Sequence, residues 1–335
     1  MKSFEVPIIY RSPLITAIKK KRKEVDKLKK DFTPTLLDFG PLHLYLARHF
    51  GFCYGVENAI EIAFRTVEEN PGKRIFLLSE MIHNPQVNAD LQAHGVQFMQ
   101  DTYGKQIIPF GSLTADDVVI IPAFGTTLET EQLLQSKGIH TEKYNTTCPF
   151  VEKVWNRSEV IAKNNYTIII HGKPNHEETR ATFSHAASNA QMIDTFKPAD
   201  TEEHFADTKD TLCYATNDNQ TAVSGMLQMP ADLAIVVGGY NSSNTSHLVE
   251  LCEAQLPTYF INSAEKILPG NKIQHYNFHS RQEQTTCNFM PAYQPVKVLL
   301  TSGASCPDAL VEGVITSLAE MYGVEDKMIE MEKQF

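Results

Sequence analysis

Six short apolar runs limit the possible folds of this chain more than any other feature. The runs are residues 42–46, 75–78, 118–121, 167–170, 233–237 and 296–300. Most of them are apolar at every position rather than at alternate positions, which is typical of strands buried on both faces. Each is followed by a glycine-rich or polar turn and then by a helical pattern. The sequence therefore predicts an α/β fold made of βα modules with parallel sheets.

Domain boundaries follow from the same pattern. A chain of 335 residues is too long for one small core, since domains usually hold roughly 100–200 residues. Residues 1–41 lack the strand-and-helix pattern, so we expect an N-terminal extension with a helix near residues 16–30. Three modules should follow, namely residues 42–147, a short middle module at 148–212, and 213–335.

Composition places the chain among ordinary globular proteins. Hydrophobic residues make up 42% and charged residues 21% of the sequence. No apolar run approaches the roughly 20 residues that a membrane-spanning helix needs, and no signal peptide is visible at the N-terminus. We therefore expect a soluble, cytoplasmic protein with no membrane partner.

The net charge of −10 is unevenly distributed. Residues 1–40 hold ten Lys or Arg and five Asp or Glu, so the remaining residues carry an excess of acid. An acidic body argues against nucleic-acid binding, which needs a basic face to contact phosphates. The basic run at residues 19–23 is interpreted as a solvated helix, and a docking surface for an acidic partner is the less favoured alternative.

Three cysteines share one local setting. Cys53, Cys148 and Cys213 each precede an expected amphipathic helix, whose N-terminus favours a thiolate. Three thiolates can bind three irons of a [4Fe–4S] cluster and leave the fourth iron open to a substrate. The alternative is that each is a buried thiol acting as a small hydrophobic residue. We apply that simpler interpretation to the other cysteines, which are Cys252, Cys287 and Cys306.

Polar motifs follow the apolar runs in an order that is similar to a known family. They are Gly51-Phe52-Cys53-Tyr54-Gly55-Val56, His83-Asn84-Pro85, Thr147-Cys148-Pro149, His176-Glu177-Glu178-Thr179, Cys213-Tyr214-Ala215-Thr216, Asn241-Ser242-Ser243-Asn244 and Ser302-Gly303-Ala304-Ser305. None is specific alone, but seven in order over residues 45–315 make a strong signal. The sequence resembles the LytB/IspH family of 4-hydroxy-3-methylbut-2-enyl diphosphate reductases.

The resemblance implies a reductive dehydration of an allylic alcohol diphosphate to isopentenyl and dimethylallyl diphosphate. It implies three βα modules around a central [4Fe–4S] cluster held by Cys53, Cys148 and Cys213. Glu178 would relay the proton, with Glu177 as its competitor, and ferredoxin or flavodoxin would supply electrons. The residues implied to bind the diphosphate are His83, His176, Ser242, Ser243, Asn244 and Ser305.

Two features depart from the family pattern. Phe124 stands where many members have a histidine, and we interpret it as lining the pocket. Cys148 and Cys213 are only 65 residues apart, against 95 between Cys53 and Cys148. The middle module therefore lacks about one βα unit, including the family's Gln-Thr-Thr segment. The Gln284-Thr285-Thr286 sequence lies after the third cysteine and is taken as a coincidence.

Two alternatives remain open on the sequence alone. One is another three-cysteine iron–sulfur enzyme, such as quinolinate synthase or a diphthamide-forming enzyme, although these lack the His-x-Glu and Asn-Ser-Ser-Asn set. The other is a non-catalytic or degenerate relative that keeps the fold. Only the short middle module favours that second alternative.

Overall fold

The computed structural model describes residues 4–28, 30–164, 167–186, 190–193 and 212–335, which fall into two compact units. Unit 1 consists of Met1–Glu5 and Tyr54–Leu212. Unit 2 consists of Val6–Cys53 and Cys213–Phe335. The chain therefore leaves unit 2 after the first of the three candidate cysteines and returns to it at the third.

A five-stranded sheet forms the centre of unit 2. In spatial order its strands are β1 (Thr35–Asp38), β2 (Leu42–Leu46), β13 (Val296–Ser302), β8 (Leu233–Val237) and β9 (Thr258–Ile261). Strand β13 is parallel to both β2 and β8, and β9 is parallel to β8. Only the edge strand β1 is antiparallel to its neighbour. Such a sheet needs helices on both faces to bury its apolar strands.

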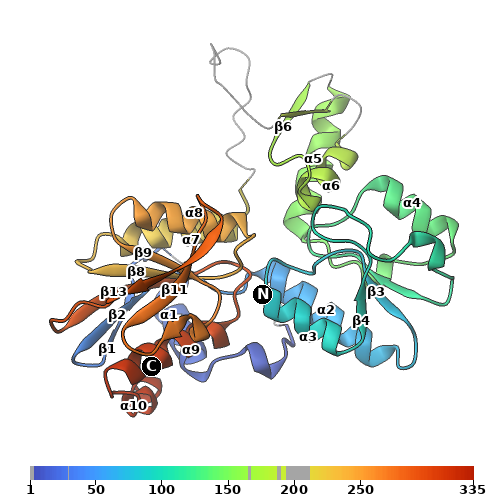
Figure 1. The fold of residues 1–335 in the computed structure, drawn as a ribbon. Helices are drawn as coiled ribbons and strands as arrows, with labels where there is room; N and C mark the ends of the chain where they lie inside the picture. The colour runs from blue at the N-terminus through green and yellow to red at the C-terminus, as the bar shows by residue number, and fades with distance from the viewer. Residues whose placement is uncertain (1–3, 29, 165–166, 187–189, 194–211) are drawn as a thin grey trace. The chain divides into compact units, whose positions relative to one another are not determined.

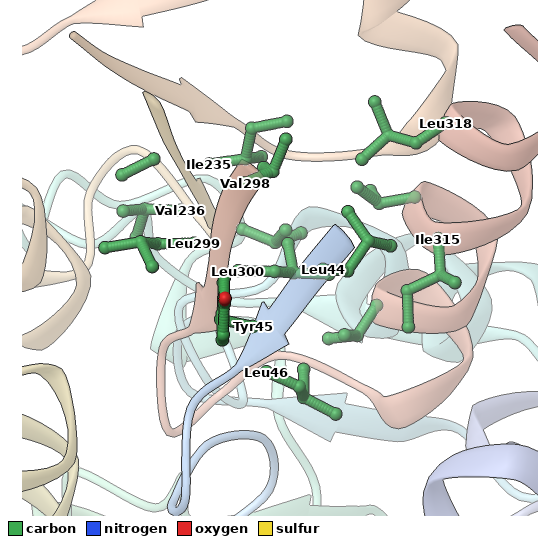
Figure 2. Close-up of a cluster of buried hydrophobic side chains, with 14 of the residues drawn as sticks. Leu44, Tyr45, Leu46, Ile235, Val236, Val298, Leu299, Leu300, Ile315 and Leu318 are labelled. Carbon is green, nitrogen blue, oxygen red and sulfur yellow. The ribbon is translucent and has the colours of Figure 1, made fainter. Parts of the chain in front are cut away.

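Helices cover both faces of this sheet (Figure 1). α7 (Tyr214–Met226) and α8 (Ser243–Glu253) pack together over one face, and α1 (Pro13–Val25) and α9 (Asp308–Met321) over the other. The C-terminal helix α10 (Lys327–Gln334) packs against α1. Figure 2 shows side chains of β2, β8 and β13 meeting those of α9 in one buried hydrophobic cluster.

Unit 2 also carries a small antiparallel sheet and two short 3-10 helices. The sheet consists of β10 (Ile267–Leu268), β11 (Lys272–Asn277) and β12 (Gln282–Cys287). The 3-10 helices are Ile8–Tyr10 and Ala264–Lys266. Gln284, Thr285 and Thr286 lie on β12, where Thr286 Oγ1 contacts His275 Nε2 at 2.9 Å. These residues are thus part of a hairpin.

Unit 1 contains two smaller parallel sheets. One has the order β4 (Val96–Phe98), β3 (Ile75–Leu77) and β5 (Val118–Ile120), and the other pairs β6 (Ile168–His171) with β7 (Ala190–Ile193). The helices are α2 (Tyr54–Glu69), α3 (Pro85–Ala93), α4 (Leu128–Ser136), α5 (Pro149–Lys163) and α6 (Glu177–His185). The 3-10 helices are Phe110–Ser112 and Glu142–Tyr144.

The predicted α/β class with parallel sheets is confirmed, and all six apolar runs are strands. The grouping of residues differs from the expected modules. Residues 42–53 do not belong with residues 54–147, because β2 pairs with β13 rather than with β3. Sequence patterns locate strands but carry little information about long-range pairing, which explains the difference.

The N-terminal segment is part of the core of unit 2 rather than an appendage. Helix α1 begins earlier than expected because the Ser12 side chain accepts a hydrogen bond from the Ile15 amide at 2.9 Å, and Pro13 occupies the first turn. Leu14, Ile15 and Ile18 are buried in the main core. Residues 1–41 therefore do not form a separate extension.

Residues 194–211 of the predicted short middle module lie outside the described part of the chain. Within the described ranges the β6–β7 sheet has two strands, against five and three in the other parallel sheets. Among the residues that the structure describes, no helix is long and apolar enough to cross a membrane.

The burial of α1 predicts a large stability effect from a single core substitution. Ile18→Ala should lower the free energy of unfolding by about 2–5 kcal/mol, because Ile18 is 0% exposed and its loss leaves a cavity. Val25→Ala is the control, since Val25 is 81% exposed on the same helix and should change stability by less than about 0.5 kcal/mol. Urea unfolding measures both, and equal small effects would contradict the packing of α1.

Candidate active site

Each of the three candidate cysteines lies at the start of a helix, as the sequence predicts. Cys148 and Cys213 are the N-cap residues of α5 and α7, and Cys53 directly precedes α2. All three are partly exposed, and none forms a disulfide. The Thr216 amide donates to Cys213 Sγ at 3.4 Å, which is the type of contact that stabilises a thiolate.

The other three cysteines are poorly suited to bind a metal. Cys252 and Cys306 are buried, and burial raises the pKa of each thiol to about 12. Cys287 is exposed on β12, away from any helix start. A cysteine binds a metal as the thiolate. The structure therefore distinguishes the three cysteines at helix starts from the other three, as the sequence context does.

The backbone of unit 1 leaves room for the Cys148 thiol. A Cβ at Gly55, in the first turn of α2, would lie 2.5 Å from Cys148 Sγ, so only glycine fits there. The Cys148 amide donates to the carbonyl of Ala123 at 2.9 Å, which fixes the start of α5 beside the loop that follows β5. The Cys148 thiol therefore has a defined position next to the start of α2.

Two histidines and an aromatic ring meet in unit 1. His83 Nε2 lies 3.0 Å from His176 Nε2, and the ring of Phe124 stacks on His83 with centroids 4.3 Å apart. His83 follows β3 and Phe124 follows β5, two neighbouring parallel strands whose carboxyl ends lie at one edge. The structure thus brings His83 and His176 together and places Phe124 against them.

The His176 ring is neutral at pH 7. Desolvation by burial, and to a smaller extent the nearby positive charges of His83 and Lys173, lower its pKa to about 4. His176 Nδ1 accepts a hydrogen bond from the Glu178 amide at 3.2 Å, so the ring proton is assigned to Nε2. His176 Nε2 then donates to His83 Nε2 at 3.0 Å.

The two neighbouring glutamates have different environments. Glu177 is buried, and its Oε2 is paired with the hydroxyl of Ser79. Desolvation raises the pKa of Glu177 to about 8, so it is protonated at neutral pH. Glu178 is exposed as a residue, yet desolvation by the protein around its carboxyl raises its pKa, while His83 acts in the opposite direction. Glu178 is therefore the glutamate that a ligand can reach.

In unit 2, two loops are tied together at the carboxyl end of the sheet. The Cys53 amide donates to the carbonyl of Ala304 at 3.1 Å, which joins the loop after β2 to the loop after β13. The latter loop contains Ser305, which is 9% exposed. Cys53 and Ser305 are thus held in neighbouring loops.

The third loop at this edge carries the Asn-Ser-Ser-Asn sequence. Ser242 is the N-cap of α8 and accepts hydrogen bonds from the amide and hydroxyl of Thr245, and Ser243 is exposed in the first turn. The side-chain Oδ1 and Nδ2 of Asn244 are buried, and neither has a hydrogen-bond partner among the described residues. Buried polar atoms are normally paired, so an unpaired amide at a helix N-terminus is suited to an anionic ligand.

Thr245 and Ser79 were not identified from the sequence. A Cβ at Gly303 would lie 2.0 Å from Thr245 Oγ1, and one at Gly238 would lie 2.8 Å away, so Thr245 fills the space at the ends of β8 and β13. Glycines directly after two strands are a signal that could have suggested this close approach. Ser79 has no such signal, because its contact with Glu177 joins residues far apart in the chain.

Across the ranges that the structure describes, no three His, Cys, Asp or Glu side chains gather as a metal site, and the cysteines are divided between the units. Cys53 and Cys213 belong to unit 2 and Cys148 to unit 1. The donor set itself fits an iron–sulfur cluster, because all three are accessible free thiols at helix starts.

Comparison with known proteins identifies the family. The LytB protein family matches residues 44–209 and 196–319, which is most of the chain. The chain belongs to this family. The other three-cysteine enzymes considered above, and a non-catalytic relative, are not favoured by this match.

Relatives within the LytB family align over most of their length. A protein named 4-hydroxy-3-methylbut-2-enyl diphosphate reductase from Synechococcus sp. (strain ATCC 27144) is 35% identical, covering 85% of this chain and 87% of its own. Another with the same name, from Cyanothece sp. (strain PCC 7425), is 33% identical and covers 87% of each chain. The Synechococcus alignment spans 353 residues, more than this whole chain has, so the relative holds residues that this chain lacks.

Solved structures show the same fold. A structure titled as the E-1-hydroxy-2-methyl-but-2-enyl-4-diphosphate reductase from Plasmodium falciparum matches with a TM-score of 0.64 at 22% identity, covering 84% of this chain and 88% of that chain. A second structure, titled as (E)-4-hydroxy-3-methyl-but-2-enyl diphosphate reductase, matches with a TM-score of 0.53 at 24% identity. It covers 83% of this chain and 99% of that chain.

The buried acid Glu177 predicts a pH-dependent stability. Its pKa rises from 4.5 unfolded to about 8 folded, so the folded state binds more protons between these values and stability falls as pH rises through this window. Glu177→Gln is neutral throughout and should raise the melting temperature at pH 8, by roughly 4–8 °C for about 2 kcal/mol. The difference should shrink towards pH 5.

The control for this measurement is Glu68→Gln, because Glu68 is exposed on α2. Its melting temperature should follow the wild type at both pH values. A Glu177→Gln protein that is less stable than wild type at pH 8 would show that Glu177 is ionised in the fold.

Proposed function

We propose that this chain catalyses the reductive dehydration of 4-hydroxy-3-methylbut-2-enyl diphosphate. The substrate takes up two electrons and two protons, the allylic C–O bond breaks, and the hydroxyl leaves as water. A new C–H bond forms at one end or the other of the allyl group, which gives isopentenyl or dimethylallyl diphosphate. The observation that carries the proposal is the set of three accessible cysteines at helix starts in a LytB family chain.

The cofactor of the LytB family is a [4Fe–4S] cluster, and we propose Cys53, Cys148 and Cys213 as its ligands. When bound, a three-cysteine cluster supplies electrons and a Lewis-acidic iron that can accept the substrate hydroxyl. The chain's own contribution is to hold the three thiolates at helix N-termini, where the dipole favours the deprotonated form. The buried cysteines, with raised pKa values, take no part.

The diphosphate is assigned to the neutral polar residues that the structure describes. We propose His83 and His176 as its ligands from unit 1, and Ser242, Ser243, Asn244 and Ser305 from unit 2. The support is the unpaired amide of Asn244, the cap of α8 at Ser242, and the 3.0 Å contact that holds the two imidazole rings together. Helix N-termini and such donors bind phosphate without requiring Lys or Arg.

Glu178 is proposed as the proton donor to the leaving hydroxyl. Its exposed position makes it reachable, and its raised pKa keeps more of the carboxyl protonated than an ordinary glutamate at the same pH. Glu177 is protonated at neutral pH, but its carboxyl is buried and paired with Ser79. Glu177 is therefore better suited to hold the start of α6 than to deliver a proton.

The two electrons require a partner, for which ferredoxin or flavodoxin is proposed. A cytoplasmic location is proposed as well, and it agrees with the six cysteines being free thiols.

The decisive experiment is anaerobic purification, with iron and sulfide counted and turnover of the allylic diphosphate measured with a chemical reductant. A loaded cluster without turnover would favour a degenerate relative, an outcome that the shorter chain makes worth testing.

The cysteine assignment predicts which substitutions remove the cluster. Cys148→Ser should abolish the brown chromophore, because a cluster bound by two thiolates is lost. Cys252→Ser is the matched control and should keep it, since Cys252 is buried with a raised pKa. Absorbance and iron content measure both. Equal loss in the two variants would contradict the assignment.

The proton-donor assignment predicts a separation of cluster binding from turnover. Glu178→Gln should keep the chromophore but lose turnover by about 10²–10⁴-fold, the usual contribution of a positioned acid. Glu177→Gln should keep much more activity, because it preserves a neutral, hydrogen-bonding side chain beside Ser79. The reverse order of activities would exchange the two roles.

A further inference from the structure

Helix α1 carries a concentration of positive charge on an otherwise acidic protein. The net charge is −10, yet residues 19–23 are all Lys or Arg. Three lysines in or just after α1 are exposed, namely Lys20, Lys23 and Lys27. In the described parts of the chain they form no ion pair with an acidic side chain. Lysines that pair with no acidic side chain of the described residues are available to a partner.

The other basic residues of α1 have structural roles. Lys19 pairs with Asp308 at 2.7 Å, and Lys21 Nζ donates to the carbonyl of Gln334 at 2.9 Å. The Arg22 guanidinium is mostly buried and donates to the carbonyls of Leu46, Ala47 and Arg48 and to the hydroxyl of Thr35. Burial accordingly lowers the pKa of Arg22 to about 9. These contacts separate the lysines that hold the helix from those that face outward.

The basic helix lies against the loop that carries the first candidate cluster ligand. A Cβ at Gly51 would lie 3.1 Å from Lys19 Nζ, so α1 reaches within two residues of Cys53. Lys19 Nζ lies 4.9 Å from the ring centroid of Phe50. Phe52 packs edge-on against Tyr10, which directly precedes the α1 cap region. An electron carrier bound at α1 would therefore contact the helix that packs against this loop.

Two other partners fit the surface less well. A membrane-bound amphipathic helix needs a free apolar face, but Leu14, Ile15 and Ile18 are already buried in the core. Nucleic acid would meet repulsion from the rest of the chain, which carries the negative charge. Val25, the last residue of α1, is 81% exposed, and Leu28 beyond it is 75% exposed. They give a small apolar contact area with a polar rim.

We propose that Lys20, Lys23 and Lys27, with Val25 and Leu28, form the docking surface for an acidic electron-carrier protein. This proposal rests on the proposed function, because that reaction consumes two electrons per turnover. Complementary charge raises the association rate and makes it sensitive to salt. Binding through this surface should weaken steeply as ionic strength rises.

The test compares two triple variants of the full chain. Lys20→Glu/Lys23→Glu/Lys27→Glu reverses the docking surface, and Lys105→Glu/Lys137→Glu/Lys272→Glu makes the same charge change elsewhere. Calorimetry without cluster measures binding of purified ferredoxin and flavodoxin at low salt. The first variant should bind the carrier at least about tenfold more weakly than wild type, and the control within about threefold.

Turnover of the cluster-loaded proteins gives the second measurement. With the protein carrier, the KM for the carrier should rise at least about tenfold in the docking variant, while turnover with dithionite and methyl viologen stays at the wild-type value. Equal weakening in both variants would show a net-charge effect and overturn the proposal. The proposal would also be overturned if the docking variant bound the carrier like wild type but lost binding to vesicles of anionic phospholipid.

The two proposals fail in distinguishable ways. If the wild type has no turnover with the chemical reductant, the proposed function fails, whatever the carrier does. If it turns over with the chemical reductant and binds the carrier independently of these lysines, only the docking surface is wrong.

Discussion

The parallel pairing of β13 with β2 on one side and β8 on the other determines what the rest of unit 2 can present. All three strands end at the same edge of the sheet, so the loops that follow them are neighbours. The Cys53 amide donates to the carbonyl of Ala304, and the Gly303 amide donates to the carbonyl of Val237. These backbone hydrogen bonds connect the three loops. Cys53, Ser305 and the Asn-Ser-Ser-Asn segment are polar groups positioned by an apolar sheet.

The same constraint explains what the sequence can and cannot predict. Continuous apolar runs correctly predict all six strands, two of them with their observed bounds, because burial on both faces determines composition locally. The pairing of β2 with β13 joins residues far apart in the sequence, such as Leu42 and Val296, and no local pattern encodes it. The burial of α1 could not be predicted for a similar reason. Lysines dominate its sequence, and only a narrow apolar stripe contacts the core.

The candidate site shows a similar division. Helix starts at the three cysteines were predictable, because Pro149 and the flanking apolar spacing are local signals. The difference between Glu177 and Glu178 was not, since it depends on Ser79, a residue remote in sequence. The longer relatives agree with a chain that lacks residues, although the expected junction falls outside the described ranges.

If the diphosphate binds at unit 1, the Glu177 carboxyl beside the site must be uncharged. An ionised Glu177 would repel the anion, but burial keeps this carboxyl protonated. Burial also keeps His176 neutral. Its Nε2 proton is donated to His83, and such a hydrogen bond is stronger where water is excluded. The anion would add negative charge beside His176, which acts to raise the pKa of this ring. Phosphate binding would therefore act against the desolvation that lowers the pKa of His176 in the free protein.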